Sequence, residues 1–566
     1  MRIKSYLILS AITLGITVSS CKKAMDLDIN VNPNNPVSAP LDLLLTSAEF
    51  TTPGIFNGVS TSTLGFVGIL ANQGSDAFAL NNSSFNGTWN SFYTGGMKDL
   101  QGILDRTAAG QSPHFRGAAF TLKAYYFGQF VDMFGDVPYD EAFGGDAATP
   151  INEPKFSKDK DIYAKLIAMT DSAIVEFAKT SPIALKGDIH FANNIPRWRK
   201  FANSVKLSLL IKTRRVDPTA DTKIRAILAS SANYISATSG AEDFLFKYNK
   251  VAAPEGRHPW YTDAYLGSNN FTYFSKQFLL EMLELGDPRL PYQVRRQTGS
   301  ILDPNNSTDR GTIPVYNAYM VLDNTSWTRL STSGVLTRGS SADSIYLAGF
   351  FGRVRGDQTG VPADVALRAV PGAYPGGGLV DYARTTARAD IRPLLGGTGA
   401  GNGVFPMITF NMIQYWDLEQ QLASGSATAA TKTLFEAAIR QSIADVVRHA
   451  KSSDPTAGDP STTAVTAYVN NWLARYDAAA SNEAKLNVVL KQAWFSGLGN
   501  GNELYTTFRR TGLPTSIDQP ASRQRQFALR LPYPSTELNL NPNASSYGTV
   551  IFDRDAIFWD NVKFKF

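Results

Sequence analysis

The sequence predicts a mainly α-helical fold with a large irregular region in its middle. Apolar residues recur at helical spacing through 41–232 and again through 406–566. Between them, 233–405 is rich in Gly, Pro, Asn and Ser and shows little helical periodicity. Apolar residues make up 43% of the 566 positions and charged residues 18%, which is typical of a globular chain. We therefore expect helices on both sides of a loop-rich segment that carries a few short strands.

The apolar spacing also predicts individual helices. They are expected at 41–50, 89–103, 115–134, 159–179, 195–215, 274–285, 406–416, 435–447, 465–473 and 486–498. The helix at 115–134 should end at Gly135 and Pro138, because glycine and proline interrupt helical geometry. In the helix at 195–215, Lys206 and Lys212 are expected to be largely left to solvent.

Helix pairs on both sides of the middle region indicate a solenoid-like or layered arrangement. No clean repeat period is present, so any helical repeats are degenerate. We expect one domain at 41–566, in which 41–232 is helical, 233–405 is a loop-rich, ligand-facing insert, and 406–566 is helical with a C-terminal tail.

The first 21 residues predict export and a lipid anchor. Arg2 and Lys4 precede an uncharged apolar run, and small residues lead to Cys21, the only cysteine. This order is typical of a signal peptide, here residues 1–20. The run is too short to span a membrane, which takes about 20 apolar residues. Acylation of Cys21 is favoured over an ordinary signal peptide with an unrelated cysteine, because the one cysteine falls where the apolar run ends.

Residues 21–40 are expected to form a flexible tether. Pro33, Pro36 and Pro40 interrupt regular structure there. Fully extended, such a segment reaches roughly 60 Å, enough to hold a folded domain away from a membrane surface. The net charge is +5, and it falls to about +3 once Arg2 and Lys4 leave with the signal peptide. So weak and dispersed a charge argues against a nucleic-acid partner.

Motifs for catalysis, metal binding and cofactor binding are absent from the sequence. The four histidines are isolated, and neither HExxH, GxSxG nor GxxxxGK[ST] occurs, so no catalytic residue, metal site or cofactor is predicted. A carboxylate pair for sugar hydrolysis is one interpretation of Asp136, Asp140 and Glu141. Their interpretation as turn residues is favoured, because they lie in a Gly/Pro turn where Asp is common. Arg509 and Arg510 are interpreted as buried arginines that hold carbonyls or carboxylates, with an anion site as the alternative.

Several segments, in order along the chain, resemble the SusD/RagB-like outer-membrane lipoproteins of Bacteroidetes. They are DINVNPNNP (28–36), FGDVPYDEA (134–142), WRKFANSVKL (198–207), DPRL (287–290), GAYPGG (372–377), RRTGLP (509–514) and LPYP (531–534) with Glu537 and Asn541-Pro542. Two segments depart from the family pattern. FGRVRGD (351–357) stands where the SusD-like branch often has GRDHGD, and Leu418-Glu419-Gln420 replaces a more usual AEA.

The resemblance implies degenerate tetratricopeptide-like helix pairs that form an α superhelix. It also implies a non-enzymatic protein of the outer membrane, lipid-anchored and facing the cell exterior. Such a protein captures an oligosaccharide or a peptide and delivers it to a TonB-dependent, SusC-like transporter. A lipid-anchored glycoside hydrolase and a structural adaptor that binds no ligand are the alternatives.

Candidate ligand contacts are aromatic and amide side chains in loop-rich segments. Sugar rings stack on aromatic faces, and their hydroxyls bond to Asn and Asp, whereas a peptide would use main-chain pairing and side-chain pockets. The predicted contacts are Asp76, Asn81, Asn82, Phe85, Trp260, Tyr261, Tyr265 and Trp327. For each aromatic residue alone, packing in the core or in a loop is the competing interpretation.

Overall fold

A computed structural model describes most of the chain. The described residues are 39–71, 80–146, 149–266, 272–296, 350, 352–353, 355–356, 369–381, 400–520 and 527–560. The predictions for Cys21, Asp76 and Trp327 lie outside these residues.

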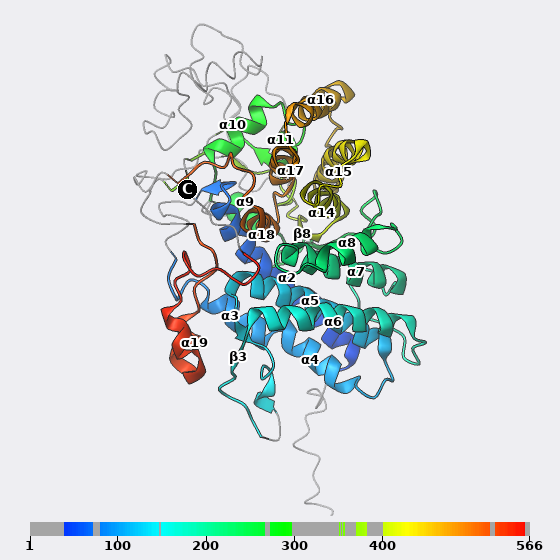
Figure 1. Ribbon diagram of the computed structural model, residues 1–566, viewed down its shortest axis with the longest axis vertical. Helices are drawn as coiled ribbons and strands as arrows, with labels where there is room; N and C mark the ends of the chain where they lie inside the picture. Colours follow the sequence, from blue (N-terminus) through cyan, green and yellow to red (C-terminus); the bar gives the residue numbers. More distant parts are fainter. Residues whose placement is uncertain are drawn as a thin grey trace, which may run out of the picture.

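Helices dominate the described chain, so the predicted mainly α fold is confirmed (Figure 1). The N-terminal helices are α2 (Leu41–Phe66), α3 (Asn86–Thr94), α4 (Gly96–Arg106), α5 (Pro113–Phe134), α6 (Asp159–Ala178), α7 (Ile195–Thr213) and α8 (Ala220–Leu228). The middle of the chain holds α9 (Pro259–Tyr265), α10 (Lys276–Glu284) and α11 (Leu290–Gln293). The C-terminal helices are α14 (Phe410–Ala423), α15 (Ala429–Ser453), α16 (Thr462–Ala478), α17 (Asn482–Ser496), α18 (Gly501–Thr511) and α19 (Ser535–Leu540). The described residues also include two 3-10 helices, η2 (Gly144–Asp146) and η5 (Pro542–Thr549).

The strands in the described residues are short and form two-stranded antiparallel pairs. β1 (Leu70–Ala71) pairs with β5 (Tyr273–Phe274), β2 (Val137–Pro138) with β3 (Phe156–Ser157), β4 (Phe244–Lys247) with β8 (Val404–Ile408), and β6 (Val294–Arg295) with β7 (Val370–Pro371). Because β4 lies near the start of the middle region and β8 lies at its end, their pairing joins the two helical parts of the chain.

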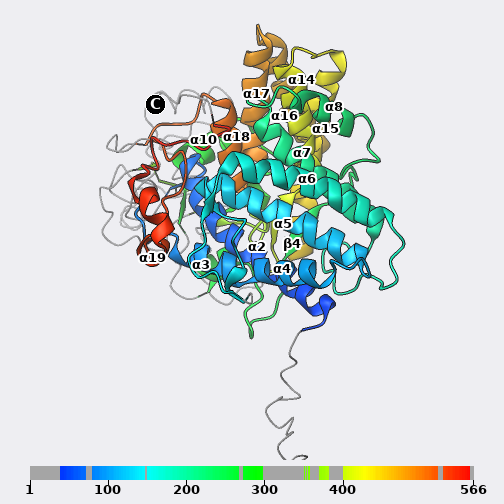
Figure 2. The same cartoon turned by 60° about the horizontal axis from the view of Figure 1, so that its bottom comes forward.

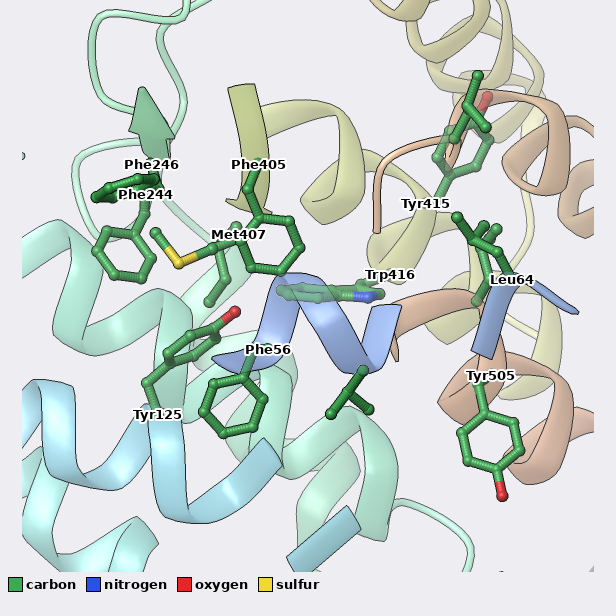
Figure 3. Packing of buried hydrophobic residues seen from close by; sticks show 14 of the residues in the cluster. Phe56, Leu64, Tyr125, Phe244, Phe246, Phe405, Met407, Tyr415, Trp416 and Tyr505 are labelled. Atoms are coloured by element: carbon green, nitrogen blue, oxygen red, sulfur yellow. The ribbon is translucent and has the colours of Figure 1, made fainter. Parts of the chain in front are cut away.

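The helices form two stacks that share one core. Helices α4 to α7 pack in order on one another, and α14 to α17 form the second stack, drawn above the first in Figure 1. Helix α18 crosses back to pack on α2, and Figure 2 shows the same two groups from another side. Phe56, Tyr125, Phe244, Phe405 and Trp416 meet where the stacks join (Figure 3). None of the helices among the described residues is long and apolar enough to cross a membrane.

Helix α2 is longer than the apolar spacing predicts. The expected helix ends at Phe50, but α2 continues through Pro53 to Phe66. Proline removes one backbone donor and usually interrupts a helix. Here Pro53 is buried and α2 packs against both α4 and α18, so tertiary contacts outweigh the local penalty.

Lys212 was expected to face solvent, but the structure shows that it is buried. Its side chain is 1% exposed, and its Nζ lies 2.6 Å from Oδ2 of Asp132 on α5. The same carboxylate accepts hydrogen bonds from the hydroxyl of Tyr163 on α6 and from Nε1 of Trp559, 3.0 Å away. Asp132 therefore joins three helices and the C-terminal segment at one buried point.

Arg509 and Arg510, which were predicted to be buried, are buried in the structure. Arg509 donates from Nη1 to the carbonyl of Leu529 and from Nη2 to that of Asp132, both at 2.6 Å. Arg510 lies 3.0 Å from Glu419 and 3.2 Å from Glu503. The interpretation of these residues as structural is confirmed: Arg509 holds carbonyls and Arg510 holds carboxylates.

Candidate functional site

The predicted aromatic residues of the middle region lie together on α9. Pro259 occupies the first turn of this helix, where its missing N–H costs nothing. Nδ1 of the His258 ring accepts the backbone N–H of Trp260 at 3.1 Å. Burial lowers the pKa of His258 to about 3, so the ring is neutral and keeps this acceptor at physiological pH. The Tyr261 and Tyr265 rings stack one turn apart, with their centroids 5.1 Å apart.

These aromatic side chains are held by specific contacts. Nε1 of Trp260 donates to the hydroxyl of Thr61 on α2 at 3.0 Å, and the Tyr265 hydroxyl donates to the carbonyl of Pro371 at 2.6 Å. A Cβ at Gly378 would lie 2.3 Å from that hydroxyl, so the close approach of the glycine-rich loop (residues 372–378) requires glycine. Trp260, Tyr261 and Tyr265 are only 3%, 5% and 2% exposed. The described geometry thus shows them supporting the loop, and a ligand contact at these residues stays a prediction.

The second group of predicted ligand contacts, Asn81, Asn82 and Phe85, directly precedes α3. Oδ1 of Asn81 accepts from the backbone N–H of Ser83 at 2.9 Å in an exposed turn. Asn82 donates its amide to the carbonyl of Tyr533 at 2.8 Å, which fastens the C-terminal segment beside α3. Phe85 is buried, with its ring edge-on to Phe134. The two groups of predicted ligand contacts therefore contact different parts of the protein. The group before α3 contacts the C-terminal segment, and the group on α9 contacts α2 and the glycine-rich loop.

The acidic residues near β2 do not form a free carboxylate pair. Asp136, Asp140 and Glu141 form ion pairs with Lys158, Lys165 and Lys155, respectively. Their interpretation as turn residues agrees with these contacts. No group of three or more His, Cys, Asp or Glu side chains among the described residues is placed to hold a metal ion.

A polar cavity that the sequence did not reveal lies between β4, β8 and helices α14, α15, α17 and α18. Its volume is about 60 Å³, which suits a few water molecules and is too small for a sugar ring. Glu419, Glu503 and Arg510 line one part of it, and Asp243 and Asp445 line another. The residues that line this cavity are far apart in the sequence, so their spacing along the chain could not predict it.

Asp243 and Asp445 form a buried acidic pair beside this cavity. Arg448 lies between them, 3.6 Å from Asp243 and 2.7 Å from Asp445. Oδ1 of Asp243 also accepts the backbone N–H of Phe410 at 2.8 Å. Burial, reinforced by the nearby Asp445, raises the pKa of Asp243 to about 7. Burial beside Arg448 lowers the pKa of His449 to about 3, so this ring adds no positive charge.

We expect Asp243→Asn to flatten the pH dependence of stability. An unfolded aspartate has a pKa of about 3.9, so the native state binds the extra proton between about pH 4 and 7. The parent's stability should fall as the pH rises through that window, and the variant should be more stable at pH 8 by on the order of 2 kcal/mol. Urea unfolding at pH 5 and pH 8 measures this difference.

A suitable control for Asp243→Asn is Asp459→Asn, which changes an exposed carboxylate paired with Lys451. This control should leave the pH profile unchanged. Equal slopes for the parent and Asp243→Asn would show that Asp243 is ionised in the native state throughout the window.

Comparison with known proteins gives matches along most of the chain. Residues 59–345 match a family model described as starch-binding and associating with the outer membrane, and residues 417–554 match one described as SusD and RagB outer membrane lipoprotein. No curated protein matches the sequence.

Solved structures resemble the whole fold. A SusD homolog from Bacteroides fragilis NCTC 9343 is 17% identical, with a TM-score of 0.64, and the match covers 92% of this chain and 99% of that one. A chitin-binding protein is 19% identical, with a TM-score of 0.66 and coverage of 92% and 100%. A chitin-binding SusD homolog from Flavobacterium johnsoniae is 17% identical, with a TM-score of 0.61 and coverage of 92% and 98%. The predicted tetratricopeptide-like helical fold is thereby confirmed.

Proposed function

Because this chain belongs to the SusD-like family of outer-membrane nutrient-binding proteins, we propose that it captures an oligosaccharide at the cell surface and delivers it to a TonB-dependent, SusC-like transporter. The observation that carries this proposal is the family match over residues 59–345, supported by a fold shared along the chain with SusD homologs.

A carbohydrate ligand is favoured over a peptide. Two of the structures that share the fold are described as chitin-binding. The proposed contacts are the aromatic and polar side chains that pyranose rings and their hydroxyls would use. They are Asp76, Asn81, Asn82, Phe85, Trp260, Tyr261, Tyr265 and Trp327.

The ligand is proposed to leave the protein unchanged. SusD-like proteins are binding proteins rather than enzymes. The carboxylates next to β2 are neutralised by lysines, and those around the polar cavity surround a space too small for a sugar. Neither arrangement offers the acid and base that flank a glycosidic bond in hydrolases.

Delivery to a transporter is tested by co-purification. The full chain, tagged at its C-terminus, is solubilised from outer membranes with a mild detergent and captured by its tag. We expect a β-barrel of the TonB-dependent class to copurify in a fixed ratio. Capture of the protein alone under conditions that preserve other outer-membrane complexes would contradict the proposed partner.

Cys21→Ala is expected to release the protein from the membrane almost completely. A lipid on Cys21 would supply the attachment, and the described helices offer no span to replace it. Fractionation of cells that express the parent or the variant measures the membrane-bound share. Ser20→Ala is the control, since it alters the neighbouring small residue and keeps the thiol. A variant that stays in the membrane fraction at the parent's level would place the anchor elsewhere.

A further inference from the structure

An open groove runs between α2 and α3, which lie side by side in both views (Figures 1 and 2). Its volume is about 580 Å³, within the range of about 300–1,000 Å³ typical of small-molecule sites. Gly54 and Gly58 of α2 line one side, and Gly87, Thr88 and Ser91 of α3 line the other. The groove is far larger than the polar cavity, and residues of α2 and α3 form most of its lining.

Packing within the protein does not explain three of the glycines that line this groove, Gly54, Gly58 and Gly87. Glycine inside a helix is less favourable than alanine, so it needs a reason. A Cβ built at Gly54, Gly58 or Gly87 would meet nothing within 4 Å, and none of the three has a positive φ. The fold would accept side chains at these positions. Because these three positions lack side chains, the groove stays open and the backbone of α2 and α3 is accessible.

The chemistry of the groove favours a neutral, hydroxyl-rich ligand. Among the residues that the structure describes, no charged side chain lines it. Thr51 and Thr94 donate their hydroxyl protons to backbone carbonyls of their own helices, which leaves their oxygens as acceptors. Thr88 and Ser91 add two more hydroxyls. Such a lining would bond to sugar hydroxyls and would give a charged peptide no counter-ion.

Phe50 provides an independent indication of a ligand next to the groove. Its side chain is 54% exposed, although it is a large aromatic, and it lies one turn before Gly54 on the same face of α2. The ring is held edge-on to Phe246 at a centroid distance of 5.8 Å. Phe246 contacts Tyr248, and from there ring contacts continue through His258 to Trp260. A fixed, exposed ring beside a hydroxyl-lined groove is a platform on which a sugar ring can stack.

We propose that the groove between α2 and α3, with Phe50 at its edge, is a binding site for a neutral oligosaccharide. This proposal rests on the proposed function and adds to it a second site, separate from the contacts proposed above, and the charge class of the ligand. The glycines let the sugar approach the helix backbone, the hydroxyls bond to it, and Phe50 stacks on one ring.

The test fills the groove without disturbing the fold. Gly58→Leu places a side chain in the open space, and Phe50→Ser removes the platform. Ser172→Leu on the exposed face of α6 is the matched control, since it adds the same side chain at an exposed helical position elsewhere. Calorimetry with chitohexaose, maltoheptaose and cellohexaose measures binding, and thermal unfolding verifies that each variant is folded.

We expect Gly58→Leu to weaken binding of the recognised oligosaccharide at least tenfold without lowering the unfolding temperature. Phe50→Ser should weaken it several-fold, and Ser172→Leu should bind like the parent. Unchanged binding by both groove variants would overturn this site while leaving the proposed function intact. Unchanged binding with loss of the copurified β-barrel would overturn it in favour of a partner surface. A parent that binds none of the three probes, nor any other neutral oligosaccharide, would overturn both proposals.

Discussion

Arg289→Ala is expected to lower the free energy of unfolding by about 3–5 kcal/mol. The Arg289 side chain is 0% exposed and forms a two-point ion pair with Asp287, with distances of 2.9 and 2.6 Å. It also donates to Ser442 on α15, Tyr468 on α16 and Gln492 on α17, at 2.7 to 2.8 Å. Removing the guanidinium leaves the Asp287 carboxylate buried without its counter-ion, which is the costly case for a buried pair. Urea unfolding followed by circular dichroism measures the loss.

The control for Arg289→Ala is Arg440→Ala. Arg440 is also paired with a carboxylate, Glu436, but both side chains are about two-fifths exposed. This change should cost at most about 0.5 kcal/mol, as exposed helical pairs usually do. Similar losses of stability in the two variants would contradict this prediction. They would mean that the bonds of Arg289 to α15, α16 and α17 contribute little to the stability of the fold.

Asp132→Ala should have the second large effect, again about 3–5 kcal/mol. The variant leaves Lys212 charged and buried, and removes the acceptor for Tyr163 and Trp559. Because Trp559 belongs to the C-terminal segment, we also expect this segment to become more accessible to protease before the rest of the chain. Unfolding and limited proteolysis of parent and variant measure the two consequences.

A double variant separates charge burial from lost packing. Asp132→Asn with Lys212→Met removes both charges and keeps most of the volume, so it should recover part of the stability lost in Asp132→Ala. The control is Asp171→Ala, whose carboxylate is half-exposed and paired with Lys206. A loss in Asp132→Ala no larger than in this control would mean that the buried junction contributes little.

Periodicity predicted most helices because each buries one apolar face, and that signal is local. The helix at 115–134 appears with nearly these bounds as α5. Periodicity gave wrong predictions where contacts with residues distant in the sequence determine helix length or burial. Pro53 lies inside α2 because α4 and α18 pack on that helix, and Lys212 is buried because Asp132 lies 2.6 Å away on another helix.

The candidate site was harder to predict for a related reason. Aromatic residues in a loop-rich segment predict ligand contacts. Trp260 and Tyr265 also bond to α2 and to the glycine-rich loop, and their contact with a ligand stays a prediction. Composition does not separate a stacking platform from core packing, since both need aromatic rings. The groove beside Phe50 gave no signal either, because glycines and threonines at helical spacing acquire meaning only once α3 is placed next to α2.

We propose that this protein binds an oligosaccharide and does not cut it. The most direct measurement is calorimetric titration of the purified protein with chitohexaose and a panel of neutral oligosaccharides, followed by a reducing-end assay on the same samples. We expect saturable heat of binding with at least one oligosaccharide and no new reducing ends after prolonged incubation. Heats of dilution alone across the panel, or the appearance of new reducing ends, would contradict it.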